Sequence, residues 1–169
     1  SMCGAIGAWL ADPSRRVVCV IGDGGMNMNL QEIATAVRVK ANIKVLILNN
    51  HSYGITVAFQ EVNFNGRTEA CTPETGYAPP DFVKIARAYG VEALRITSQA
   101  SVSRTLDYIL NYGGFIICDV DCGTFHSYFP KVSGWDQSIE DMEPYLPNDE
   151  FVANMTIPIS ESSKRQRKL

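Results

Sequence analysis

The sequence predicts a doubly wound α/β domain in which helices flank a mainly parallel sheet. Three observations predict it. Short apolar runs rich in β-branched residues recur along the chain, segments with helical periodicity separate them, and glycine or polar residues follow several of the runs directly. Strands that alternate with helices need right-handed crossovers, which place consecutive strands parallel in one sheet.

The first part of the predicted sheet comes from two buried-type strands, residues 17–21 (VVCVI) and 43–48 (IKVLIL). A helix begins near Cys3, ahead of the first strand. Between the strands, a loop leads to a helix over residues 30–40, whose apolar residues repeat at positions i, i+3, i+4 and i+7. Asn29 and Glu32 fit a variant of the capping box at its start.

Residues 51–79 show no sustained period and contain several glycines and prolines. They predict a long irregular connection with one helical turn near Val57. Connections of that length inside a compact domain are usually functional.

The remaining strands and helices follow in alternation. A helix starts at Pro80 and stops at Gly90, and a weaker strand covers residues 91–96. The next helix runs from Ser98 or Ser101 through Asn111, before a buried strand over residues 115–120. After that strand the pattern fails, because prolines interrupt mixed polar and aromatic residues. We expect that segment to drape over the sheet or over a neighbouring subunit.

Length and composition predict one globular domain over residues 3–159, because 169 residues with 46% hydrophobic content suffice for one core. Residues 1–2 are expected to be a vector-derived remnant. Residues 160–169 are expected to form a disordered basic tail, since four of them are Lys or Arg and serines precede them.

The net charge of −3 argues against a nucleic-acid partner or an anionic membrane surface. No apolar run reaches the roughly 18 residues that would cross a bilayer. The five cysteines are odd in number and contain no C-x-x-C pair, which favours free thiols in a reducing compartment. We therefore expect a cytoplasmic protein.

The residues directly after the first two strands carry the candidate site. Ligands of open α/β sheets bind beyond the carboxyl ends of the strands. The glycines of the run Gly22-Asp23-Gly24-Gly25 let backbone amides approach an anion such as phosphate. Asp23 would repel phosphate unless a cation lay between them, and an Asn oxygen with a nearby carbonyl would complete a site for Mg²⁺ or Ca²⁺. Tyr53 and Gly54 are expected to fold back over the phosphates.

The sequence Gly22-Asp23-Gly24, followed by Asn49-Asn50, resembles the cofactor motif of thiamine-diphosphate enzymes such as transketolases, pyruvate decarboxylases and acetohydroxyacid synthases. Asn50 lies 27 positions after Asp23, within the narrow range of those families. The resemblance implies thiamine diphosphate and Mg²⁺, with the metal held by the side chains of Asp23 and Asn50 and by the Ser52 carbonyl. It also implies that the Gly24 and Gly25 amides contact the diphosphate. Many relatives have Ser at the position of Gly25, which implies one missing hydroxyl contact and weaker phosphate affinity.

Three longer stretches, residues 28–54, 79–96 and 135–155, are similar to the C-terminal domain of acetolactate-synthase-like enzymes. This resemblance implies an oligomeric enzyme that decarboxylates a 2-oxoacid and then releases or ligates the carbon fragment. The Glu that activates the cofactor in that family belongs to a pyrimidine-binding domain, which the same or another chain would supply. We therefore assign no catalytic residue here and expect an N-terminally truncated fold that is inactive alone.

Two alternatives for the whole chain remain open: the small subunit of a two-chain decarboxylase, and a non-catalytic cofactor-binding or regulatory module. Several residues also have two interpretations. His51 could touch diphosphate or be an ordinary loop residue, and Gln60, Glu61 and Arg67 could face substrate or solvent. His126 lies near acidic and thiol side chains that could form a metal cluster, although the spacing matches no zinc pattern.

Overall fold

The computed structural model describes residues 1–124, 138 and 140–169. The chain divides into two compact units, residues 1–126 and residues 127–169. This division differs from the expected single domain over residues 3–159. Each unit is described by itself below.

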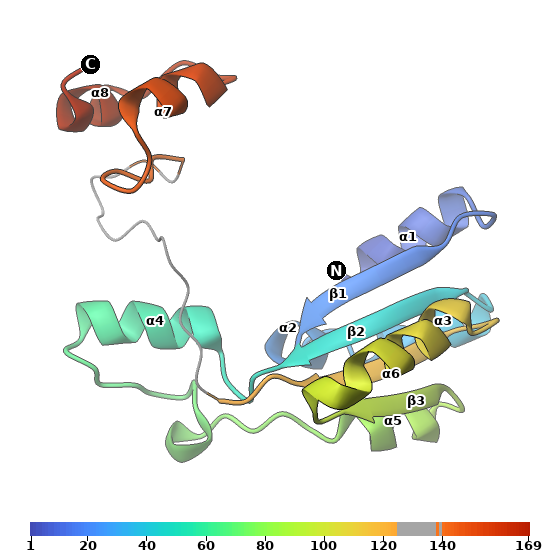
Figure 1. Cartoon of the computed structure of the whole chain (residues 1–169). Coiled ribbons are helices and arrows are strands. Elements are labelled where there is room, and N and C mark those ends of the chain that lie inside the picture. The colour runs from blue at the N-terminus through green and yellow to red at the C-terminus, as the bar shows by residue number, and fades with distance from the viewer. Residues whose placement is uncertain (125–137, 139) are drawn as a thin grey trace. The chain divides into compact units, whose positions relative to one another are not determined.

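The first unit contains a four-stranded parallel sheet with the strand order β1-β2-β4-β3 (Figure 1). The strands are β1 (Val17–Gly22), β2 (Ile43–Asn49), β3 (Glu92–Ile96) and β4 (Ile116–Asp121). All three strand pairs are parallel. The predicted doubly wound α/β fold is therefore confirmed, and the strand bounds agree with the sequence pattern to within one residue.

Helices cover both faces of this sheet. On one face, α1 (Met2–Ala11), α3 (Glu32–Arg38) and α5 (Phe82–Ala88) pack on the alternate strand residues that form the larger core. On the other face, α6 (Gln99–Asn111) packs over β3 and β4 around the smaller core. Met2, expected to be a remnant outside the fold, is fully buried in the larger core.

The Gly-Asp-Gly-Gly segment differs from the predicted loop, because Asp23 begins a short helix, α2 (Asp23–Asn27). The predicted capping box also does not form. The Asn29 side chain donates instead to the Gly25 carbonyl at 2.9 Å, so it ties the turn to α2 and does not cap the following helix. That helix, α3, accordingly begins at Glu32, later than the pattern indicated.

The single turn expected near Val57 is a ten-residue helix, α4 (Gly54–Asn63), followed later by a 3₁₀ turn, η1 (Pro73–Thr75). Ile55, Phe59 and Val62 do carry helical spacing. The glycine and the β-branched residues lower the helix propensity of this segment, so the helical spacing was not recognised as a full helix. None of the residues of α4 is buried.

The second unit contains α7 (Asn148–Asn154) and α8 (Glu161–Arg167), so residues 160–169 differ from the expected disordered tail. The Ser160 side chain caps α8 by accepting from the Ser163 amide at 3.2 Å. Arg167 is buried, its Nε donates to Asp141 at 2.7 Å, and its guanidinium stacks 4.3 Å from the Phe151 ring. The basic residue therefore has a specific buried partner, which charge counting could not reveal.

Within the described ranges of the chain, none of the helices combines the length and the apolar character that crossing a bilayer requires.

Candidate functional site

The site forms where the parallel strands end. Gly22 at the end of β1 pairs with Leu48, and Asn49 at the end of β2 pairs with Asp121 of β4, so the following loops leave the sheet at one edge. A pocket of about 480 Å³ opens there. All eight residues predicted for the cofactor site line it, together with four others: Gly22, Asp23, Gly24, Gly25, Asn50, Ser52, Tyr53 and Gly54, with Leu48, Ile55, Thr56 and Cys122.

The Asn50 amide, the Asp23 carboxylate and the Ser52 carbonyl meet on one side of this pocket. With its oxygen on this side, the Asn50 amide places Oδ1 2.9 Å from Oδ1 of Asp23 and 3.1 Å from the carbonyl oxygen of Ser52, a contact among acceptors that requires a cation between them. Neighbouring ligands of an octahedral Mg²⁺, each bound at about 2.05 Å, lie about 2.9 Å apart. The three atoms therefore fit the donor set and the spacing of a magnesium site. Separations this short exclude an arrangement in which the three groups point away from one another.

The Asn50 amide can adopt two orientations here. In the one described above, its nitrogen donates to the Ser52 hydroxyl at 2.8 Å. Turned by 180°, the nitrogen would instead donate to Asp23 and to the Ser52 carbonyl, and the oxygen would accept from the Ser52 hydroxyl. The turned amide suits a loop without metal, and the first orientation suits a loop that binds a cation.

Asp23 is a buried carboxylate, with 1% of its surface exposed. Its Oδ2 accepts a hydrogen bond from the Tyr77 hydroxyl at 3.0 Å, while its Oδ1 faces Asn50. No Lys, Arg or His in the described part of the chain forms an ion pair with it. Burying a carboxylate costs free energy unless an opposite charge compensates it, so a cation beside Oδ1 would offset the desolvation cost of Asp23.

Tyr77 was not predicted from the sequence. Burial of its phenol, with the Asp23 carboxylate beside it, holds the pKa of Tyr77 well above its ordinary value, so the hydroxyl stays a donor. Its ring packs against Tyr53 with 4.1 Å between ring centroids. The only sequence signal was a lone aromatic residue in a segment rich in glycine and proline.

Gly24 is required by the close approach of Tyr53. A Cβ atom at Gly24 would lie 2.5 Å from Cε1 of Tyr53, which is well inside contact distance. At Gly25 a Cβ would lie 3.2 Å from Cγ1 of Ile21, so a serine there would fit only if Ile21 shifted slightly. Gly24 is therefore needed to leave room for the Tyr53 ring, whereas a side chain at Gly25 is limited only by Ile21.

The segment that carries Tyr77 is tied to α4 and to the site. The Tyr53 amide donates to the Cys71 carbonyl at 2.9 Å. Oε1 of Gln60 accepts from the Glu69 amide at 2.8 Å and from the buried Cys71 thiol at 3.2 Å. Gln60, considered for substrate contact, therefore holds this loop against α4 through its hydrogen bonds. Glu61 and Arg67, considered with it, are exposed and do not line the pocket.

His51 lies beside the pocket and does not line it. Its backbone has φ of 57°, in the left-handed region that costs a non-glycine residue roughly 1 kcal/mol. Its Nε2 lies 3.3 Å from Oδ1 of Asp121. The pKa of Asp121 is lowered, first by a hydrogen bond from the Gly123 amide and then by His51.

The alternative metal cluster around His126 falls outside the residues that the structure describes. Among the residues it does describe, no three His, Cys, Asp or Glu side chains gather in a way that could hold a metal ion. A metal at the strand ends would therefore rely on one carboxylate, an amide oxygen and a backbone carbonyl, which are donors that Mg²⁺ accepts.

Comparison with known families identifies the kind of domain that this chain contains. A family model described as "Thiamine pyrophosphate enzyme, C-terminal TPP binding domain" matches residues 1–120, well over half of the chain. The chain belongs to this family of cofactor-binding domains, and the resemblance seen in the sequence is confirmed. The match includes Ser1 and Met2, in keeping with the burial of Met2.

The similar proteins are acetolactate synthases. The chain is 35% identical over 135 residues to acetolactate synthase of Arthrospira platensis, which covers 79% of this chain and 23% of that protein. It is 33% identical over 128 residues to the isozyme 2 large subunit of Escherichia coli, covering 76% and 23%. A probable large subunit of Methanococcus aeolicus is 31% identical over 150 residues, covering 88% and 24%. The domain is thus acetolactate-synthase-like, and it spans about a quarter of these relatives' length.

Proposed function

We propose that this domain binds thiamine diphosphate through a Mg²⁺ ion held by Asp23, Asn50 and the Ser52 carbonyl. The observation that carries the proposal is that one end of the Asn50 amide lies 2.9 Å from Asp23 Oδ1 and 3.1 Å from the Ser52 carbonyl oxygen, where an Asn50 oxygen would join both of them in binding a cation. The amides of Gly24 and Gly25, in the first turn of α2, would contact the diphosphate, since such amides have no partner within their helix. Gly22, Tyr53 and Gly54 would complete the cofactor-binding wall.

The residues of this chain bind and orient, and none of them is assigned a catalytic role. Asp23 holds the metal, Tyr77 fixes the rotation of Asp23, and the Tyr53 ring closes over Gly24. Thiamine diphosphate, when bound, supplies the carbanion-stabilising chemistry that cleavage of a 2-oxoacid needs. The proposed reaction is decarboxylation of a 2-oxoacid, with release or ligation of the remaining fragment.

The proposed enzyme is larger than this domain and forms a homo-oligomer in which a pyrimidine-binding domain, from the same or another chain, completes the cofactor site. Ile55 and Val62, two exposed apolar residues on α4, support a further protein contact next to the pocket. The large-subunit names of several relatives favour this proposal over a separate small subunit. The five cysteines are all free thiols, which supports a cytoplasmic location.

Calorimetric titration of the chain with thiamine diphosphate, with and without Mg²⁺, tests the binding proposal. The wild-type chain should bind only when Mg²⁺ is present. Asp23→Asn keeps the shape of the side chain but removes its charge, and we expect it to weaken binding roughly 100-fold. Asp107→Asn, the same chemical change on the exposed surface of α6, is the matched control and should leave binding unchanged.

A wild-type chain that binds no cofactor at any Mg²⁺ concentration would contradict the proposal, and so would either of two further results. One is cofactor binding by the wild-type chain with the same affinity whether or not Mg²⁺ is present. The other is a folded Asp23→Asn variant that binds as tightly as Asp107→Asn. Circular dichroism of both variants establishes that they are folded before the titrations are compared.

A further inference from the structure

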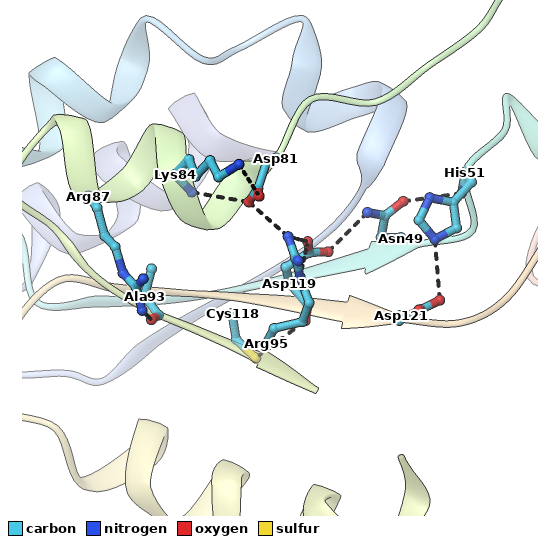
Figure 2. Close-up of polar contacts among 10 residues, drawn as sticks. All are labelled: Asn49, His51, Asp81, Lys84, Arg87, Ala93, Arg95, Cys118, Asp119 and Asp121. Atoms are coloured by element: carbon cyan, nitrogen blue, oxygen red, sulfur yellow. Dashed lines mark hydrogen bonds and ion pairs between the residues drawn. The ribbon is translucent and has the colours of Figure 1, made fainter. Parts of the chain in front are cut away.

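The Asn49–Ser52 turn, which carries Asn50 and the Ser52 carbonyl, is connected to an ion pair on the neighbouring strands between the buried Asp119 and the partly exposed Arg95. Figure 2 shows a continuous line of polar contacts from Asp81 through Arg95 and Asp119 to Asn49 and His51. Asp119 of β4 has 2% of its surface exposed, and Asn49 at the end of β2 has 4%. Neither residue lines the pocket.

Asp119 uses its two oxygens for two different partners. Oδ2 accepts from Nε of Arg95 at 3.1 Å, and a second guanidinium nitrogen lies 3.0 Å from it. Oδ1 accepts from Nδ2 of Asn49 at 3.0 Å. A carboxylate can only accept hydrogen bonds, so Asp119 forces the Asn49 amide to present its nitrogen toward β4.

The opposite end of the same amide then points to the turn. Oδ1 of Asn49 accepts from the His51 backbone amide at 3.1 Å, a side-chain to backbone bond two residues ahead that closes a turn. His51 has its φ of 57° inside this turn. Its two sequence neighbours are Asn50 and Ser52, which supply two of the three converging oxygens.

We propose that Asp119 is a positioning residue for the metal-binding turn: it fixes the Asn49 amide, which in turn fixes the His51 backbone and aims Asn50 and Ser52 at Asp23. This role rests on the proposed function, because the turn matters for activity only if it holds the cation. Arg95 serves Asp119 by compensating its buried charge, and Asp81 contacts Arg95 at 2.8 Å from the more exposed side.

Asp119→Asn tests the proposal. An amide at position 119 must offer its nitrogen either to Arg95 or to Asn49, so one contact is lost and the Asn49 amide is no longer forced into one orientation. Asp81→Asn is the matched control. It makes the same chemical change in the other aspartate that contacts Arg95, and it leaves the contact between Asp119 and Asn49 intact. Asn remains a good helix cap, so α5 should keep its start.

Two readouts separate positioning from general stability. The first is the hydrogen-exchange rate of the His51 backbone amide, measured by NMR, which should rise about tenfold in Asp119→Asn. The second is the Mg²⁺ concentration for half-maximal thiamine diphosphate binding, which should rise roughly tenfold. Asp81→Asn should stay within about twofold in both, as expected for a partly exposed ion pair.

The exchanged pair Asn49→Asp with Asp119→Asn provides a rescue. Asp at position 49 can accept from both His51 and the new Asn at 119, while the oxygen of that Asn accepts from Arg95. We expect the His51 exchange rate to return to within about threefold of wild type. If Asp119→Asn does not fold, Asn49→Ala tests the same path, because it removes the connecting amide and keeps the Asp119 and Arg95 pair.

The proposal is overturned if Asp119→Asn, or Asn49→Ala in its place, changes the His51 exchange rate and the Mg²⁺ midpoint no more than Asp81→Asn does. A lower unfolding temperature with an unchanged midpoint would show a purely structural role and would also overturn it. If the wild-type chain binds no cofactor at any Mg²⁺ concentration, the proposed function fails, and the His51 exchange rate alone decides the positioning role.

Discussion

At the scale of single residues, the site depends on how tightly small and large side chains are matched. Gly24 leaves no room for a Cβ because the Tyr53 ring fills the space, and Tyr53 cannot swing away freely because it packs on Tyr77. Tyr77 in turn donates to Asp23. The Asp23 carboxylate, which we propose binds the metal, is thus held in place by Tyr77, and Tyr77 packs on the Tyr53 ring that Gly24 makes room for.

We predict that Gly24→Ala destabilises the chain by about 2 kcal/mol, because overpacking forces neighbouring side chains out of place. In a Tyr53→Ala background the same substitution should cost nothing or be slightly stabilising, since alanine favours a helix over glycine. A double-mutant cycle by urea denaturation measures this coupling. An equal cost of Gly24→Ala in both backgrounds would show that the ring contact is not the cause.

The part of the site that could be predicted from the sequence consists of residues that directly follow the first two strands. Glycine, aspartate and asparagine directly after apolar strand runs gave Gly22, Asp23, Gly24, Gly25 and Asn50, because parallel strands bring their carboxyl ends to one edge. The resemblance to thiamine-diphosphate enzymes added Ser52, and the turn expected after it added Tyr53 and Gly54. Tyr77 and Asp119 could not be found this way. Each acts through a partner more than 50 positions away, Asp23 for Tyr77 and Asn49 for Asp119, and no sequence spacing records such contacts.

At the scale of elements, two helices on the same face of the sheet end with the same backbone geometry but with different residues. After α3, Lys40 has φ of 56°, and the Ala41 amide reaches back to the Ala36 carbonyl at 3.0 Å. After α5, Gly90 has φ of 74°, and the Val91 amide reaches the Ala86 carbonyl at 2.9 Å. Both are Schellman endings, in which a left-handed residue follows the helix cap.

We therefore predict opposite effects of glycine and non-glycine at these two positions. Lys40→Gly should stabilise the chain by about 0.5–1 kcal/mol, because glycine adopts a positive φ without a steric penalty. Gly90→Ala should destabilise it by about 1 kcal/mol for the same reason. Thermal unfolding of both variants is the measurement, and a destabilised Lys40→Gly would contradict this explanation of the helix endings.

The prediction of helices and strands succeeded where the hydrophobic pattern was complete, and it failed where tertiary contacts determine the bounds of an element. The runs at residues 17–21 and 43–48 gave β1 and β2, and Gly90 marked the end of α5 as expected. The helix α4 was missed because its apolar stripe begins at a glycine and includes β-branched residues. The Asn29 cap failed because its amide nitrogen donates to the Gly25 carbonyl and its oxygen accepts from the Cys3 thiol.

At the scale of the whole molecule, the chain consists of two units with different kinds of core. The first is built on a parallel sheet with apolar layers on both faces. The second holds a buried ion pair, in which the side chains of Arg167 and Asp141 are both fully buried. Burial would raise the pKa of Asp141, but hydrogen bonds from Arg167 and Ser163 and from the Glu143 amide outweigh it, so the pKa lies below its ordinary value.

This lowered pKa predicts acid sensitivity of the second unit. A carboxyl group whose folded pKa is depressed stabilises the fold fully above its unfolded pKa, about 3.9 for Asp, and loses that contribution as the pH falls through the folded value. Amide hydrogen exchange in α7 and α8 should therefore accelerate when the pH falls below about 4. Because exchange chemistry itself depends on pH, the comparison uses protection factors.

Asp141→Asn should remove this acid dependence and lower the protection of α7 and α8 already at neutral pH, by about 3 kcal/mol, because it leaves the buried Arg167 charge without its carboxylate. Glu161→Gln, which breaks the exposed pair with Lys164, is the control and should change little. Equal protection in Asp141→Asn and Glu161→Gln would mean that the buried pair does not hold the unit together.

We propose that Asp23, Asn50 and Ser52 direct three oxygens at one divalent cation that binds thiamine diphosphate. Anomalous diffraction from crystals of the chain grown with thiamine diphosphate and Mn²⁺, a substitute for Mg²⁺ with scattering that can be located, tests this most directly. We expect one anomalous peak about 2.0–2.3 Å from Asp23 Oδ1, Asn50 Oδ1 and the Ser52 carbonyl oxygen, next to the diphosphate. Bound cofactor with no peak at these three atoms, or with the metal held by other residues, would contradict it.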